Sequence, residues 1–349
     1  MTARSVIGWD IGGAHLKAAL LERGELLDAA QWPCPLWQGL GQLESALAAA
    51  RTRWPDRDEH AQAVTMTGEL VDAFAHREDG VRRIAALIAA TLPAPQFFAG
   101  AGTWRSAGEV GAAWREIASA NWLATALHTA QVLGERTGVL VDIGSTTTDL
   151  VPFRRGEVLA LGRNDAERLA RCELVYQGVV RTPLCALAQR IAWGGREFNV
   201  MNEFFATTAD VYRLTGELDP EFDQQVSADG ANKDAAGSRV RLARMIGMDA
   251  RDAGESQWLD FARAWRERQL ALLREQLGRV CAAHGLHAPG LLVSTGCGDF
   301  LATDLTPAGW SVSTYAQCVA GIRDAASVPR AQVCASAVAV AALFAREND

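Results

Sequence analysis

The amino-acid sequence predicts an α/β fold in which two related domains enclose a ligand cleft. The chain has 349 residues, which is long enough for two domains with separate cores. Strand-like and helix-like segments alternate along most of it. A strand ending in Asp-Ile-Gly, a turn of small residues and a second strand occur twice, first at Asp10 and again at Asp142. Such self-similarity over a long interval indicates duplicated domains rather than a short-period repeat.

The first domain is expected over residues 1–135. Its first strands are short and joined by tight turns, because Gly12-Gly13 and Arg23-Gly24 supply turn residues. The expected elements are, in order, strands at 5–11, 16–21 and 26–31, a helix at 36–54, a strand at 61–66, a helix at 80–92, a strand at 96–99 and a helix at 118–133.

The second domain is expected over residues 136–349, with a helical insertion at about 163–285. Residues 163–251 are less regular and richer in polar loops, whereas 256–283 has apolar residues spaced for one buried helix face. The last helix is alanine-rich and nearly all apolar, so it should pack closely, with the N-terminal domain as one possible partner. The expected elements are strands at 137–143, 148–154 and 157–161, a helix at 256–283, a strand at 291–294 and a helix at 331–345.

Composition argues against several classes of protein. A net charge of −7 disfavours a broad nucleic-acid-binding face. The N-terminus lacks the features of a signal peptide, and the longest apolar run, 335–345, is too short to span a bilayer. Seven scattered cysteines without a C-x-x-C pair disfavour a disulfide framework and a structural zinc site. We therefore expect a cytoplasmic protein without membrane or nucleic-acid partners.

The two Asp-Ile-Gly turns have the residues that a phosphate site needs. Glycines and small residues let backbone N–H groups approach a phosphate closely. The aspartates cannot bind phosphate directly, but each can hold Mg²⁺, often through water, and the metal then bridges to phosphate oxygens. Asp10 and Asp142 are therefore the expected metal ligands. The phosphate-binding residues expected from the turns are Gly12, Gly13, Gly144, Ser145, Thr146 and Thr147.

Other nucleotide motifs are absent or incomplete. The sequence has no G-x-x-x-x-G-K-[ST], which excludes a P-loop protein. Gly296-x-Gly298 follows a predicted strand, but no third glycine and ribose-binding acid follow it, so it is not a dinucleotide fingerprint.

The order of the motifs resembles the actin/sugar-kinase/Hsp70 superfamily. Residues 6–17 and 139–149 match its two phosphate motifs, residues 291–299 match its adenosine motif, and the alanine-rich helix matches its closing connecting helix. The resemblance implies two actin-like (ribonuclease H-like) domains, with Gly296 and Gly298 at the nucleotide-like motif. Asp-Ile-Gly-Ser-Thr-Thr-Thr-Asp is most similar to the hydantoinase/oxoprolinase branch.

A narrower resemblance extends over most of the chain. It rests on the segments 8–17, 66–70, 119–122, 173–183, 206–212, 228–231 and 241–245. These resemble a family of methanofuran biosynthesis that joins an aminomethyl-furan-methanol diphosphate to γ-glutamyl-tyramine. Its bacterial relatives serve tetrahydromethanopterin-linked one-carbon metabolism, where a tyrosine-derived acceptor can replace the tyramine.

The resemblance implies that a phenol oxygen displaces diphosphate from a furylmethyl carbon. The protein would hold the leaving group, neutralise its charge and exclude water. Mg²⁺ at the two aspartates, with Lys17 and Arg181 nearby, would stabilise the departing diphosphate. Three carboxylates remain open as the base for the phenol: Glu69, Asp149 and Asp210.

The remaining candidates each have a structural alternative. Lys17 and His15 could bind phosphate, or be a solvated lysine and a turn histidine. Trp122, beside Asn121, could stack on a furan or phenol ring, or belong to the core. Tyr176 lies with Arg181 in a loop-like stretch that has no obvious packing period, and the resemblance favours a functional role for both residues. Arg241 and Arg244 lie one helical turn apart, and could clamp a glutamyl carboxylate or phosphate or lie on a solvated helix face.

Two other functions remain open. An ATP-dependent kinase or hydantoin-opening hydrolase would keep the fold, and Gly296-x-Gly298 favours a nucleotide, so ATP is a possible cofactor beside Mg²⁺. A ligand-responsive regulator would need a basic helix-turn-helix before the first phosphate strand, where only five residues precede Val6.

Overall fold

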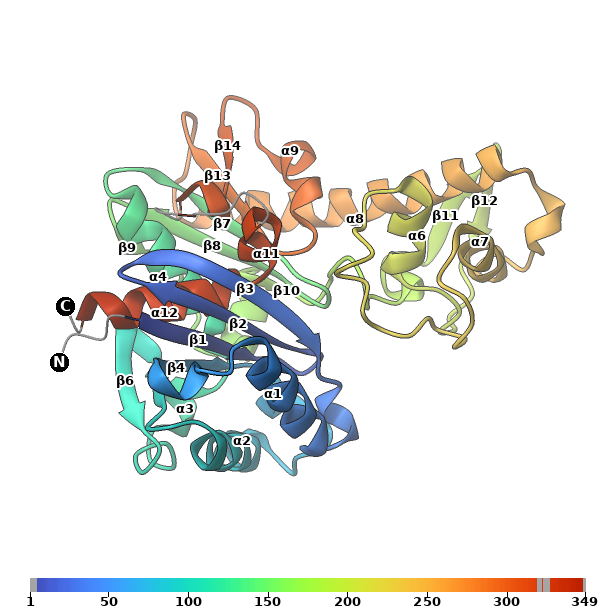
Figure 1. Cartoon of the computed structure of the whole chain (residues 1–349). Helices are drawn as coiled ribbons and strands as arrows, with labels where there is room; N and C mark the ends of the chain where they lie inside the picture. Colours follow the sequence, from blue (N-terminus) through green and yellow to red (C-terminus); the bar gives the residue numbers. More distant parts are fainter. Residues whose placement is uncertain (1–4, 319–321, 323–326, 348–349) are drawn as a thin grey trace. The chain divides into compact units, whose positions relative to one another are not determined.

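The computed structural model describes residues 5–318, 322 and 327–347, and within these the chain forms two compact units (Figure 1). The first unit contains the described parts of Met1–Gly138, Phe153–Glu167 and Ser313–Asp349, and the second contains Val139–Pro152 and Arg168–Val312. The first unit is therefore not the continuous segment 1–135 that the sequence predicts.

A six-stranded sheet forms the centre of the first unit. Its strand order is β3-β2-β1-β4-β5-β6, with β1 antiparallel to β2 and parallel to β4. The parallel pair places the carboxyl ends of β1 and β4 at one edge of the sheet, where loops carry functional groups. The strands are β1 (Ser5–Ile11), β2 (His15–Glu22), β3 (Glu25–Pro33), β4 (Ala61–Met66), β5 (Gln96–Ala99) and β6 (Thr103–Ser106).

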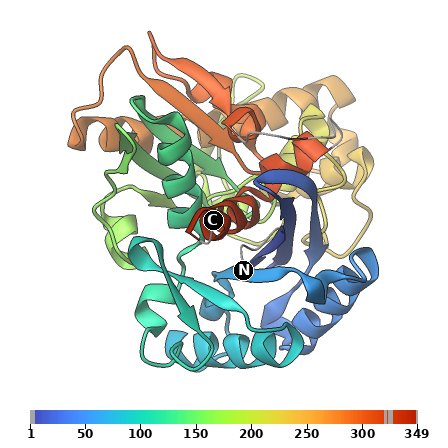
Figure 2. The same cartoon turned by 60° about the vertical axis from the view of Figure 1, so that its left-hand side comes forward.

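Helices cover both faces of this sheet (Figures 1 and 2). Side chains alternate along β1, so Ile7, Trp9 and Ile11 lie in the core with residues of α1 (Gly41–Arg53) and α2 (Arg77–Thr91). Gly8 points the other way, toward α12 (Ala335–Glu347), which packs on β1 and on α4 (Asn121–Leu133).

The second sheet has the order β10-β8-β7-β13-β14, and β9 pairs with β8. The long helix α8 (Glu255–Ala283) carries the insertion: the β11–β12 hairpin, α6 and α7 pack around it (Figure 1). The remaining elements are β7 (Thr137–Ile143), β8 (Thr148–Arg154), β9 (Glu157–Val158), β10 (Leu174–Val175), β11 (Arg190–Trp193), β12 (Arg196–Asn199), β13 (Leu291–Thr295), β14 (Ser311–Thr314), α5 (Asp165–Ala170), α6 (Thr208–Thr215) and α7 (Ala235–Arg244).

Several expected elements differ from the structure at their ends, among them two helices and a strand. The helix expected at 36–54 is a short 3-10 turn, Leu36–Gln38, and then α1, because Gly39 between them has φ 116°. The helix expected at 331–345 begins earlier, as α11 (Val328–Val333), and is interrupted at Cys334 before α12. The strand expected at 157–161 ends at Val158.

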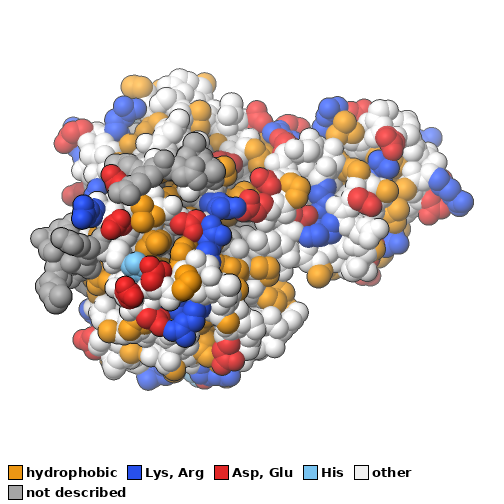
Figure 3. Space-filling model, in the orientation of Figure 1, with side chains coloured by type: hydrophobic (Ala, Val, Ile, Leu, Met, Phe, Trp, Pro, Cys, Tyr) orange, Lys and Arg blue, Asp and Glu red, His pale blue; other side chains and the backbone are white. Residues whose placement is uncertain are grey.

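One face of the molecule carries charges of both signs, and the seven cysteines form no disulfide. Basic and acidic side chains are interspersed over the described part of the face in Figure 3. None of the seven cysteines is in a disulfide. Within residues 5–318, 322 and 327–347, no helix combines the length and apolarity needed to cross a bilayer.

The buried His128 of the first unit should make the free energy of unfolding depend on pH. His128 Nδ1 on α4 lies 2.6 Å from Tyr315 Oη, and burial, followed by repulsion from Arg346, lowers the pKa of His128 to about 4. Between pH 6.5 and 4 the unfolded chain therefore binds a proton that the folded chain does not. We expect His128 to reduce the free energy of unfolding by about 3 kcal/mol over this range.

Urea unfolding at pH 7.5 and pH 5 measures this effect, with His128→Gln as the matched variant. The wild type should lose more stability on acidification than the variant, which has no titrating side chain at this position. Equal losses in the two proteins would contradict the assignment.

Candidate functional site

The two Asp-Ile-Gly turns have the same backbone hydrogen bonds. Gly12 N donates to His15 O at 2.9 Å, and Gly144 N donates to Thr147 O at 2.9 Å. The next loop closes on each turn in the same way: Thr67 N donates to Ile11 O at 2.9 Å, and Gly298 N donates to Ile143 O at 2.8 Å. The repeat seen in the sequence is therefore also a repeat of backbone structure. In this repeat, the loop after β4 corresponds to the Gly-x-Gly loop after β13, because each donates a backbone hydrogen bond to the strand of its Asp-Ile-Gly turn.

Asp10 is the last residue but one of β1 and is only 3% exposed. Ser336 Oγ, at the start of α12, donates to Asp10 Oδ2 at 2.5 Å, and Asn121 Nδ2, at the start of α4, lies 3.4 Å from the same oxygen. Asp10 Oδ1 is buried and has no hydrogen-bond partner in the described residues. A buried carboxylate oxygen without a partner is costly, so this oxygen is a candidate contact for a cation or a ligand group. Lys17 lies directly across from Asp10 in the β1–β2 register.

Glu69 follows β4 at the same edge of the sheet and is 1% exposed. Ser119 Oγ donates to Glu69 Oε1 at 2.7 Å, whereas Oε2 is buried and unpartnered within the described part of the chain. Burial raises the pKa of Glu69 to about 7, against the lowering effect of the Ser119 hydrogen bond.

A three-residue segment connects these two carboxylates. Ser119 contacts Glu69, and two residues later Asn121 contacts Asp10. Ser119 has φ 51°, an uncommon conformation for a residue other than glycine. Such conformations are retained where the surrounding structure fixes them, often at functional sites.

The second turn is enclosed by close backbone contacts. A Cβ atom at Gly296 would lie 2.2 Å from Ile143 O and 2.6 Å from Asp142 Oδ1, so only glycine fits beside the aspartate. Arg181 N donates to Ser145 O at 2.9 Å, and Arg181 Nη1 lies 3.4 Å from Thr146 Oγ1. Burial lowers the pKa of the Arg181 guanidinium, as expected for a cation placed away from water.

Gln269, a buried side chain that the sequence does not single out, helps to hold the 176–183 loop on this turn. Thr182 Oγ1, Thr208 Oγ1 and Gln269 Nε2 all donate to Gly178 O, at 3.1, 2.9 and 3.0 Å. Gly178 itself has no room for a Cβ, which would lie 2.4 Å from Gly144 O. Gln269 lies on α8, and its contact spans 91 residues of sequence, so no local pattern indicates it.

Two of the proposed bases are ion-paired within the second unit. Asp149 Oδ1 is 2.8 Å from Nη2 of the buried Arg168. Asp210 accepts at Oδ1 from Arg213, Ser238 and Arg241, and at Oδ2 from Thr207 N, closing the capping box that begins α6. This geometry favours structural roles for both carboxylates over the proton transfer expected from the sequence.

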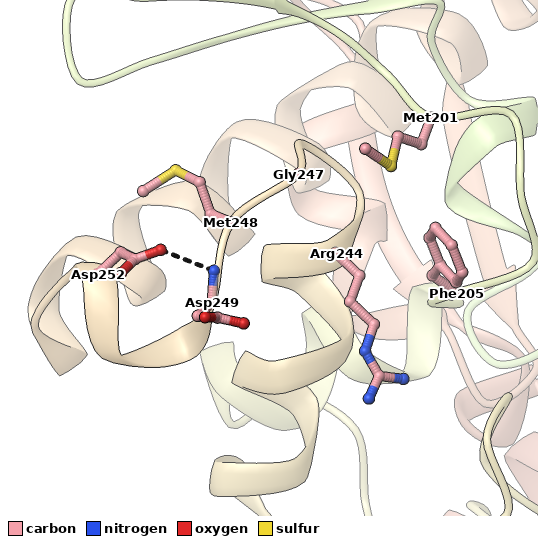
Figure 4. Close-up of a pocket in the computed structure, with 7 residues that line it drawn as sticks. All are labelled: Met201, Phe205, Arg244, Gly247, Met248, Asp249 and Asp252. Carbon is pink, nitrogen blue, oxygen red and sulfur yellow. Dashed lines mark hydrogen bonds between the residues drawn. The ribbon is translucent and has the colours of Figure 1, made fainter.

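Arg241 and Arg244 do clamp an anion, but it is a carboxylate of the chain. Arg241 Nη1 lies 3.0 Å and Arg244 Nη1 3.5 Å from the Asp229 carboxylate. Arg241 is completely buried, so a solvated helix face does not describe it. Arg244 is half exposed and lines a shallow pocket of about 330 Å³ in the insertion (Figure 4). The pocket is lined by Met201, Phe205, Arg244, Gly247, Met248, Asp249 and Asp252, none of which belongs to either turn.

The other expected site residues are distributed between core and surface. His15 and Trp122 are buried, whereas Tyr176 is 59% exposed. In the described residues, no group of three or more His, Cys, Asp or Glu side chains is arranged to hold a metal ion.

Comparison with known proteins identifies the family of the chain from its sequence and its fold from its structure. The sequence model of the Hydantoinase/oxoprolinase family matches residues 60–337. The (4-{4-[2-(γ-L-glutamylamino)ethyl]phenoxymethyl}furan-2-yl)methanamine synthase of Methanocaldococcus jannaschii is 31% identical over 300 residues, 86% of this chain and 88% of that protein. The protein of the same name from Methanococcus vannielii is 31% identical over 167 residues, 48% of this chain and 73% of that protein.

A solved structure of nucleotide-free acetone carboxylase aligns with a TM-score of 0.53 and 13% identity, over 97% of this chain and 70% of that one. This likeness concerns the fold alone, and the fold is the actin-like α/β fold that the sequence predicts. The chain therefore belongs to the hydantoinase/oxoprolinase family and, within it, to the family of the (4-{4-[2-(γ-L-glutamylamino)ethyl]phenoxymethyl}furan-2-yl)methanamine synthases.

Proposed function

We propose that the chain is a transferase of methanofuran or methylofuran biosynthesis. It joins an aminomethyl-furan-methanol diphosphate to the phenol oxygen of γ-glutamyl-tyramine or a tyrosine-derived acceptor, and diphosphate leaves. The observation that carries this proposal is the 31% identity over 88% of the Methanocaldococcus jannaschii synthase, whose name contains the phenoxymethyl-furan ether that such a transfer forms.

The two turns support the part of the reaction that involves diphosphate. Turns of glycines and small residues favour an anion, and in the second turn Arg181 beside Thr146 adds a cation and a hydroxyl. Lys17, across the strand pair from Asp10, adds a second cation. A cation at a phosphate turn would stabilise the negative charge that builds up on the leaving oxygen as the furylmethyl carbon–oxygen bond breaks.

The residues also fit Mg²⁺. This ion keeps several waters and binds through one or two carboxylates together with substrate phosphate oxygens, so it does not need a cluster of three protein ligands. Asp10 Oδ1, buried and without a protein partner in the described residues, is the oxygen best suited to it. Asp142 has the same position in the second turn as Asp10 has in the first. When bound, the metal would supply further charge neutralisation for diphosphate.

The test is an assay with the purified protein, the furan diphosphate and γ-glutamyl-tyramine, followed by mass spectrometry of the ether and measurement of released diphosphate. A tyrosine-derived phenol in a parallel reaction determines the acceptor. We expect ether and diphosphate in equal amounts. Diphosphate release without ether, or neither product with either acceptor, would overturn the proposal.

Calorimetry separates this function from an ATP-dependent one. We expect inorganic diphosphate to bind with Mg²⁺ and to bind much more weakly without it. Binding of Mg²⁺-ATP with no response to diphosphate would instead support a kinase or ATP-dependent hydrolase.

A further inference from the structure

The proposed transfer needs a base for the phenol proton, and the structure separates the three carboxylates that the sequence leaves open. Asp149 is paired with Arg168. Asp210 accepts from Arg213, Arg241 and Thr207 N, which hold its two oxygens in place. A carboxylate held in this way has its oxygens engaged by donors of the chain, which leaves less room for a substrate hydroxyl. Glu69 differs from both.

Glu69 has one oxygen fixed and one available. Oε1 accepts from Ser119 Oγ at 2.7 Å, which orients the carboxyl group. Oε2 is buried and has no hydrogen-bond partner among residues 5–318, 322 and 327–347. An unpartnered acceptor in a fully buried carboxylate is costly unless a donor reaches it during function, as the hydroxyl of a phenol can.

Glu69 also lies at the edge of the sheet where the leaving group is expected. β1 and β4 are parallel neighbours, with Ile11 opposite Met66, so the residues that follow the two strands emerge together. A Cβ atom at Gly68 would lie 3.2 Å from both Ile11 O and Gly12 O, so the Glu69 loop packs on the first phosphate turn.

Two charges act on Glu69 through Ser119. Arg77 Nη2, from α2, donates to Ser119 Oγ at 3.2 Å and pairs with Asp165 at the start of α5. Asp165 Oδ2 lies 3.2 Å from the same hydroxyl. Burial raises the pKa of Glu69 to about 7. Arg77 lowers this pKa and Asp165 raises it, so the two charges act in opposite directions.

We propose that Glu69 is the base that accepts the phenol proton, and that Ser119, Arg77 and Asp165 are positioning residues that hold it for this role. The inference rests on the proposed function. The phenol O–H proton passes to Glu69 Oε2, the phenol oxygen forms the bond to the furylmethyl carbon, and the electron pair of the breaking carbon–oxygen bond leaves with diphosphate. The proton returns to water when the product departs.

The test uses the pH dependence of kcat/KM in wild type, Arg77→Gln and Asp165→Asn. Activity should rise with pH through an inflection near 7, because the base must be deprotonated. Arg77→Gln leaves Asp165 unpaired and should move the inflection up by about one pH unit, whereas Asp165→Asn leaves Arg77 unpaired and should move it down by about one. A purely structural role would lower activity in both variants without opposite shifts.

The matched control is Arg83→Gln, which removes the same charge from the exposed face of the same helix, where Arg83 pairs with Asp79. Its inflection should stay at the wild-type value. Glu69→Gln should lower kcat by about 10³-fold, with Glu69→Asp recovering part of the loss. Shifts of the same sign, or no shift, in the Arg77 and Asp165 variants would overturn the inference.

A second measurement does not depend on turnover. Carboxyl ¹³C NMR of glutamate-labelled protein, with the Glu69 signal assigned by Glu69→Gln, should show the same inflection and the same opposite shifts. If wild type forms no ether, the proposed function fails, while the NMR titration still decides whether Arg77 and Asp165 control Glu69. If ether forms and Glu69 titrates below pH 5 in every protein, the assignment of the base fails alone.

Discussion

Asp10→Asn is expected to lower kcat of the proposed transfer by about 10³-fold without lowering the free energy of unfolding. The variant keeps the size of the side chain and one carbonyl oxygen for Ser336 Oγ and Asn121 Nδ2. It removes the negative charge, and with it the oxygen that has no partner in the described structure and is the proposed ligand of Mg²⁺. Because an unpaired buried charge is costly, its loss should leave stability unchanged or raise it.

The matched control is Asp28→Asn on β3 of the same sheet. Asp28 accepts two hydrogen bonds from Arg53, at 2.7 and 2.8 Å, and one from Trp54 Nε1 at 3.0 Å. This variant should lose about 1 kcal/mol of stability and keep its activity. Steady-state kinetics and urea unfolding of both variants measure the contrast. An Asp10→Asn protein that is fully active, or one that is inactive because it is unfolded, would contradict the expected role of Asp10.

The local structure of the site could be predicted from the sequence, because it depends on neighbouring residues. Asp10 and Gly12 lie in one strand and turn, and the second copy at Asp142 and Gly144 removes the ambiguity of a single turn. The turn hydrogen bonds of Gly12 and Gly144 confirm the predicted turns, while the ligands assigned to these turns stay predictions.

The contacts that give each carboxylate its role could not be predicted in the same way. Ser336 reaches Asp10 across 326 residues of sequence, and Ser119 reaches Glu69 across 50. Nothing local distinguishes Glu69 from Asp149, since the difference lies in Arg168, which neutralises Asp149, and in the burial of Glu69. These are properties of packing, and only the folded chain determines them.

The insertion was the least predictable part of the fold, although one signal was present. Helices α6 and α7 have only 8 and 10 residues, too few for a clear apolar period. However, Thr207 and Asp210 have the spacing of a capping box, and the structure forms it at the start of α6. Asp210 is one of the three carboxylates that the sequence leaves open as a base, whereas the structure uses it at the start of a helix.

Gly8→Ala should destabilise the first unit by about 3 kcal/mol or more and also reduce activity. A Cβ atom at Gly8 would lie 2.0 Å from Ala337 O and 2.9 Å from Ala341 N, so α12 would have to move away from β1. Ser336 precedes Ala337 in that helix, and its displacement would break the hydrogen bond to Asp10. The same substitution therefore affects packing and the first turn together.

Gly278→Ala is the matched control, because Gly278 lies inside α8 with open space where a Cβ would be. There alanine should stabilise the protein by about 1 kcal/mol, through its higher helix propensity. Thermal unfolding and the ether-forming assay measure both variants. If Gly8→Ala unfolds at the wild-type temperature, the close contact between β1 and α12 does not hold the helix in place. If Gly8→Ala is destabilised but keeps full activity at low temperature, the hydrogen bond from Ser336 is not needed to position Asp10.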